Sequence, residues 1–83
     1  MYINSLIENF KKKLLLQRYS PNSIRNYSGT VRTFLDLAEQ KFTHPDEINE
    51  EIIEKYVYWK VEKHKISASH QRMIVASIDK FYQ

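Results

Sequence analysis

Hydrophobic residues recur along this chain of 83 residues at intervals of three and four, the spacing of one face of an α-helix. Four such runs occur, and a stretch with turn residues, 41–48, separates the second run from the third. Only two prolines and one glycine are present, which is too few for the many turns of an all-β chain. The pattern therefore predicts an all-α fold of four helices in a single domain, residues 1–83. The first two expected helices cover about residues 3–18 and 21–40, the third begins after Asn49, and the fourth begins after Ser67 and runs to Gln83.

Three helix starts carry a capping residue. Ser20 precedes Pro21, and proline suits the first helical position because the N–H that it lacks has no partner there. Asn49 and Ser67 stand in the same relation to the third and fourth helices. These residues fix where each helix begins.

Each run predicts which face of its helix enters the core. In the first helix, Leu15 and Leu16 are expected to widen the apolar stripe. The expected core positions are Ile3, Leu6, Ile7, Phe10 and Leu14; Ile24, Tyr27, Val31, Phe34, Leu35 and Ala38; Ile52, Ile53, Tyr56, Val57 and Lys60; and Ile74, Val75, Ile78, Phe81 and Tyr82.

The polar face of the second helix contains no carboxylate before Asp36. A face that serves only solubility usually mixes both signs of charge, whereas this one combines arginines with short hydrogen-bonding side chains. We therefore expect it to bind an anion. Its residues are Asn22, Arg25, Asn26, Gly29, Arg32 and Thr33.

Charge is segregated along the chain. Residues 1–35 hold six Lys/Arg and one acid, residues 36–62 hold three and eight, and residues 63–83 hold four and one. Folding can bring the two basic ends onto one surface suited to nucleic acid. Two alternatives stay open: three solvated helical faces, or a protein-interaction module that self-associates through its basic and acidic surfaces.

Two stretches resemble the SAM-like core-binding domain of tyrosine recombinases, the phage integrases. SPNSIRNY, followed by Phe34-Leu35, resembles the second helix of that domain, with Ser23 where the family usually has threonine. ISASHQRMIVASIDKFY resembles its last helix, where Arg72 matches a position that is often polar or basic. Asp79 stands at a position where the family commonly has a basic residue.

The resemblance implies a SAM-like orthogonal bundle that binds double-stranded DNA. In the family, this domain and a separate catalytic domain of the same protein clamp the duplex, and the second and fourth helices face the major groove. Other recombinase protomers on the DNA are further expected partners. The expected DNA-binding residues are Ser20, Asn22, Ser23, Arg25, Asn26, Arg32, Ser69, Arg72 and Lys80.

Catalytic and cofactor sites are not expected within these residues. There is no cysteine, and His44, His64 and His70 lack the spacing of metal ligands. No glycine-rich phosphate loop or nucleophile elbow occurs, and the six tyrosines are interpreted as packing residues. No apolar run approaches the ~20 residues of a membrane span. We therefore expect a cytoplasmic DNA-binding fragment that is not itself an enzyme. A helix-turn-helix regulator fits less well because the second helix is too long.

Overall fold

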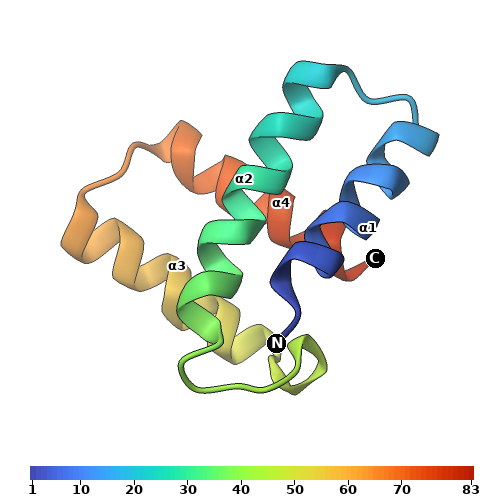
Figure 1. Cartoon of the computed structure of the whole chain (residues 1–83). Helices are drawn as coiled ribbons and strands as arrows, with labels where there is room; N and C mark the ends of the chain where they lie inside the picture. The colour runs from blue at the N-terminus through green and yellow to red at the C-terminus, as the bar shows by residue number, and fades with distance from the viewer.

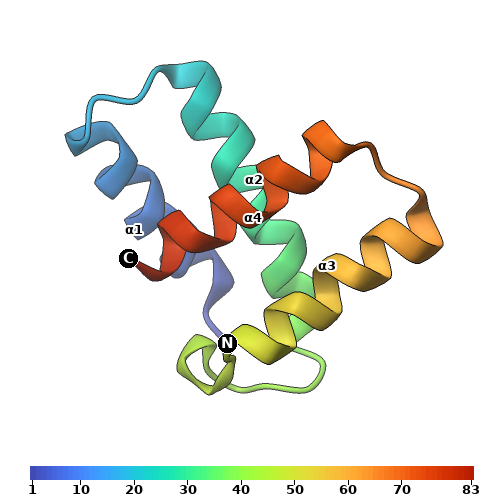
Figure 2. The same cartoon turned by 180° about the vertical axis from the view of Figure 1, so that it is seen from behind.

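The computed structural model describes all 83 residues and contains four α-helices, one short 3-10 turn and no strand, which confirms the all-α prediction. The main helix contacts are α1 on α2, α2 on α4 and α3 on α4. Figures 1 and 2 show α2 crossing α4 near the middle of both, with α1 on one flank and α3 on the other. The elements are α1 (Ile3–Leu16), α2 (Pro21–Ala38), the 3-10 turn η1 (Pro45–Glu47), α3 (Glu50–His64) and α4 (Ala68–Tyr82).

The three predicted caps are all formed. The side chains of Ser20, Asn49 and Ser67 each accept a hydrogen bond from the backbone N–H three residues later, at 3.2, 3.0 and 3.1 Å. Each bond satisfies one donor that the first helical turn leaves without a partner. The helix ends were predicted less well, because α1 and α2 each stop two residues earlier than expected.

A tight corner joins α1 to α2. Arg18 adopts a left-handed backbone conformation with φ 67°. Its N–H bonds to the Leu15 carbonyl at 3.0 Å, and the N–H of Tyr19 reaches back to the Leu14 carbonyl at 3.2 Å. This pair of bonds is a Schellman motif, in which the left-handed residue is usually glycine. The corner holds the start of α2 in a fixed direction relative to α1.

The core lies where α1 and α4 meet α2, and it continues to the middle of α3. Phe10 of α1 contacts Phe81 of α4 edge to face, with ring centroids 5.6 Å apart. Phe34 of α2 packs against Tyr56 of α3 at 4.9 Å. The twelve buried hydrophobic residues are Ile3, Ile7, Phe10, Leu14, Val31, Phe34, Leu35, Ile48, Tyr56, Val57, Ile74 and Ile78.

Some predicted core positions are wrong. Leu15 and Leu16 are 63% and 83% exposed, because α1 meets α2 only along the stripe that contains Leu14. Val75 of α4 is 39% exposed, whereas two serines, Ser28 and Ser77, are buried. The serine hydroxyls donate to backbone carbonyls of their own helices, Arg25 at 3.3 Å and Met73 at 2.6 Å, so no buried side-chain N or O atom lacks a hydrogen-bond partner. A hydrophobicity pattern cannot identify such serines as core.

The loop between α2 and α3 is held by its own side chains. The Glu47 carboxylate accepts hydrogen bonds from the Thr43 hydroxyl and N–H, at 2.6 and 3.2 Å. The Thr43 hydroxyl is the main reason that the pKa of Glu47 lies below its usual value. From α4, the Tyr82 hydroxyl donates to the Pro45 carbonyl at 2.9 Å. The loop is therefore tied to the last turn of the chain's final helix.

Candidate nucleic-acid interface

The first turns of α2 gather four of the residues predicted to bind DNA. The hydroxyls of Ser20 and Ser23 are 3.1 Å apart, and the Arg25 guanidinium donates to the side-chain oxygen of Asn22 at 3.1 Å. Ser23 supplies the N–H that Ser20 caps, and no intrahelical bond uses the N–H of Asn22. A helix N-terminus of this kind, beside an arginine, suits phosphate oxygens.

Arg25 also borders a hollow of about 370 Å³ that lies between α2, α3 and α4. Two cationic side chains, Arg25 and Lys60, line the hollow, together with a histidine and several hydroxyl or amide groups. None of the lining residues is acidic, so the electrostatic potential there favours an anion. The lining residues are Arg25, Asn26, Gly29, Thr30, Thr33, Tyr56, Lys60, His70 and Ile74.

Two aromatic rings lie beside the second cation. The Lys60 ammonium lies 5.9 Å from the ring centroid of Tyr56 and 5.8 Å from that of Trp59. Tyr56 is itself buried, which raises the pKa of its hydroxyl. Because Tyr56 belongs to the core, Lys60 stands on a rigid support.

The first turn of α4 reaches the same hollow through His70. Its neighbour Ser69 accepts a hydrogen bond from the Arg72 guanidinium at 3.4 Å, and both side chains are exposed. The structure therefore brings the start of α4 next to the polar face of α2. These are the two helices that the sequence predicted to form the interface.

Lys80 occupies a different environment from the other predicted residues. Its ammonium donates to the Tyr19 hydroxyl at 2.8 Å and lies over the rings of Tyr19 and Tyr27, 5.0 and 5.3 Å from their centroids. The hydrogen bond to Tyr19 is the main reason that the pKa of Lys80 is raised. Its charge is already engaged, and the contact ties α4 to the start of α2.

Arg32 is also separated from this hollow. It is half-buried and lines a second depression with the first residues of α1, where Asp36 and Glu39 are neighbours. Two carboxylates beside a guanidinium reduce its attraction for phosphate. The two arginines of α2 therefore differ in their surroundings although they lie on the same helix.

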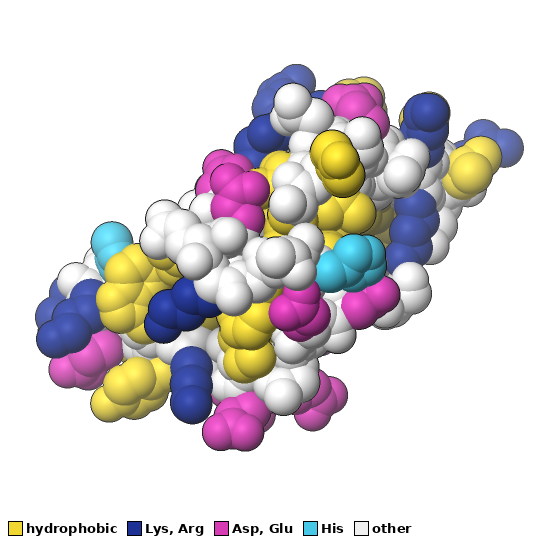
Figure 3. Space-filling view, turned by 60° about the horizontal axis from the view of Figure 1, so that its bottom comes forward, with side chains coloured by type: hydrophobic (Ala, Val, Ile, Leu, Met, Phe, Trp, Pro, Cys, Tyr) yellow, Lys and Arg dark blue, Asp and Glu magenta, His cyan; other side chains and the backbone are white.

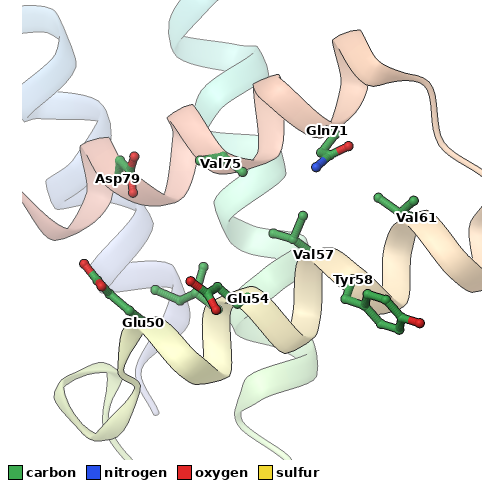
Figure 4. Close-up of a pocket in the computed structure, with 9 residues that line it drawn as sticks. Glu50, Glu54, Val57, Tyr58, Val61, Gln71, Val75 and Asp79 are labelled. Carbon is green, nitrogen blue, oxygen red and sulfur yellow. The ribbon is translucent and has the colours of Figure 1, made fainter.

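The acidic residues of α3 line other surfaces. Glu50 and Glu54 border a groove between α3 and α4 that shares no lining residue with the hollow, together with Asp79 (Figure 4). Glu51 pairs with Lys55 at 3.6 Å. Figure 3 shows a face of the molecule on which acidic and basic side chains are interspersed. Hydrophobic side chains reach the surface between them.

Comparison with known families places residues 6–83 in the N-terminal SAM-like domain of phage integrase. The chain belongs to this family. No curated protein and no solved structure gives a significant match. The family is all-α, in agreement with the four helices found here, and the SAM-like domain does not include the catalytic domain of an integrase.

Sequence reasoning missed three residues of the integrase domain's hollow. Thr30 was not assigned to the polar face of α2, Lys60 was placed in the core-facing row of the third helix, and His70 was considered only as a metal ligand. A signal existed for His70, which directly follows the predicted Ser69. For Lys60 there was none, because its place depends on how α3 packs. No group of three or more potential ligand residues could hold a metal ion. None of the helices has both the length and the hydrophobicity to cross a membrane.

Proposed function

We propose that this integrase domain is the DNA-binding domain of a tyrosine recombinase, and that it holds duplex DNA with the N-terminal half of α2 and the first turn of α4. One observation carries the proposal: the hollow where these helices meet has cations on two walls, Arg25 and Lys60, and no acidic residue. Cations placed in this way neutralise phosphates, the dominant source of affinity for DNA.

The residues predicted to bind DNA, of which Arg25 and Asn26 line the hollow, divide into two roles. Arg25 and Arg72 are the groups long enough to reach a phosphate or a guanine edge in the major groove. Ser20, Asn22, Ser23, Asn26 and Ser69 are short polar side chains that suit hydrogen bonds to backbone oxygens of DNA. Lys80 acts by holding α4 against the start of α2, and Arg32 contributes less because of its acidic neighbours.

In the parent recombinase, the chemistry of strand exchange belongs to a separate catalytic domain. That domain would close on the DNA from the opposite side, and the present domain would add affinity and orientation. Its own interface is small, so the isolated domain is expected to bind duplex DNA with a Kd of about 10⁻⁴–10⁻⁶ M at physiological salt.

Fluorescence anisotropy with a labelled duplex at several salt concentrations tests the proposal. The logarithm of the association constant should fall linearly with the logarithm of salt concentration, with a slope of about −0.9 per phosphate contacted. Arg25→Ala and Arg72→Ala should weaken binding and flatten this slope by about one unit if the lost contact is a phosphate. A lost base contact would instead cost about 1–3 kcal/mol and depend on the DNA sequence.

Arg32→Ala is the matched control, since it removes the same side chain from the same helix. It should change affinity less than Arg25→Ala does. Chemical-shift mapping on the wild-type chain locates the surface that contacts DNA. The shifted residues should cluster on α2 and the start of α4. Shifts confined to α3, or no binding at low salt and high protein concentration, would contradict the DNA interface and favour a protein-interaction module.

A further inference from the structure

A groove between α3 and α4 lies outside the proposed DNA interface. Its floor includes Val57, Val61 and Val75, and its volume is about 570 Å³. Figure 4 shows these valines between the two helices. Val75 belongs to the face of α4 that the sequence assigned to the core, yet it is 39% exposed. Val75 and the half-buried Val61 therefore leave apolar surface uncovered beside the buried Val57.

The groove is acidic at one end. Figure 4 shows Glu50, Glu54 and Asp79 near the same end of it, from both helices. None of the three takes part in an ion pair, and no Lys or Arg lines the groove. Carboxylates beside an apolar floor select an occupant that carries basic and aliphatic side chains together.

The same chain displays such a surface on α1. Leu15 and Leu16 are 63% and 83% exposed and lie at i+3 and i+4 from Lys12, so the three side chains share one helical face. We call Lys12, Leu15 and Leu16 the α1 ridge. Of the three consecutive lysines on this helix, Lys11 pairs with Glu8 at 3.5 Å and Lys13 donates to the Lys80 and Gln83 carbonyls at 2.8 and 2.7 Å. Lys12 is the one without an intramolecular partner.

We propose that the α3–α4 groove of one copy binds the α1 ridge of a second copy, with Lys12 at the acidic end and the two leucines over the valines. The two surfaces are complementary in two ways: the leucines of the ridge face the valines of the groove, and the lysine faces its carboxylates. Ridge and groove are different surfaces, so the contact is heterologous and each molecule can use both at once. The proposal is independent of DNA binding, which uses the hollow on α2.

Sedimentation velocity without DNA tests the contact over a range of protein concentrations. The average mass should rise with concentration at low salt. It should rise less at 1 M salt, where the screening length falls to about 3 Å from ~10 Å at 0.1 M. Leu16→Ser should weaken association about tenfold or more, because it removes an exposed apolar side chain that the contact would bury. Circular dichroism should show that this exposed position leaves the fold intact.

Charge reversal gives the sharper test. Lys12→Glu and Glu54→Lys should each weaken self-association strongly. The first brings a carboxylate of the ridge against Glu50, Glu54 and Asp79, and the second puts an ammonium beside Lys12 and leaves only Glu50 and Asp79 to attract it. Mixing the two variants should restore association, because the unaltered ridge of the Glu54→Lys chain then meets the unaltered groove of the Lys12→Glu chain. Lys63→Glu, a reversal at an exposed lysine of α3 outside both surfaces, is the matched control and should leave association unchanged.

Three results would overturn the proposal: a wild-type chain that stays monomeric at low salt and high concentration, association unaffected by Lys12→Glu and Leu16→Ser, or a mixture of the two reversed variants that stays monomeric. A monomeric chain whose groove nevertheless binds a Lys/Leu-rich helical peptide would also overturn it, by assigning the groove to another protein.

Discussion

At the scale of single residues, Gly29 shows a position where the sequence is not optimal for its helix. It lies inside α2 with an ordinary helical backbone, and a Cβ built on it meets nothing within 4 Å. Gly29→Ala should therefore raise the free energy of unfolding by about 1 kcal/mol, because glycine costs that much in a helix interior. In thermal unfolding, the midpoint should rise by about 4–8 °C for a domain of this size.

The same variant reports on the hollow that Gly29 lines. A lower midpoint would contradict the open space beside this residue. A higher midpoint together with weaker DNA binding would indicate that a phosphate approaches the backbone there, which a methyl group obstructs.

At the scale of elements, Tyr82 joins the end of α4 to η1. Burial, and secondarily the charge of Asp46, raises the pKa of Tyr82 to about 12. A raised tyrosine pKa means that the folded state favours the neutral hydroxyl. Its contribution to stability is complete below the unfolded pKa of about 10 and is lost as pH rises through the folded value. Urea unfolding should show stability falling between about pH 10 and pH 12.

Tyr82→Phe isolates this contribution. Near pH 7 it should cost at most about 0.5–1.5 kcal/mol, the usual net value of a hydrogen bond. The lower end is expected, because the Pro45 carbonyl keeps a second bond from the N–H of Ile48. Between pH 10 and pH 12 the variant should lose less stability than the wild type. Tyr2→Phe, at an exposed tyrosine, is the control, and equal alkaline losses in all three chains would contradict the role given to Tyr82.

At the scale of the whole molecule, Phe34 connects the helices into one core. It is 2% exposed and packs on Tyr56, so α2 and α3 meet through its ring. Phe34→Ala should lower the free energy of unfolding by about 3–5 kcal/mol. That loss is a large part of the total free energy of unfolding, which is about 5–15 kcal/mol for a typical domain. Chemical denaturation measures the loss, and Leu16→Ala, at an exposed position, should change stability by less than about 0.5 kcal/mol. Similar losses in the two variants would contradict the assigned core.

The sequence by itself determined those features that depend on neighbours along the chain. Ser20, Asn49 and Ser67 cap their helices as predicted, because a cap is a bond between residues three apart. The period of the apolar residues gave the number of helices and placed Phe34 in the core. The two family-like stretches led to the correct family, since they preserve residues at local spacings.

Only the tertiary structure decided which face of each helix is buried where the helices cross. It buries Ser28 and Ser77, whose hydroxyls are satisfied within their own helices, and leaves Leu16 and Val75 exposed. It also brings Lys60 of α3 and His70 of α4 to Arg25 of α2, residues that are 35 and 45 positions away in sequence. Such placements depend on crossing angles and on which helices meet. A one-dimensional pattern of hydrophobicity contains no information on either.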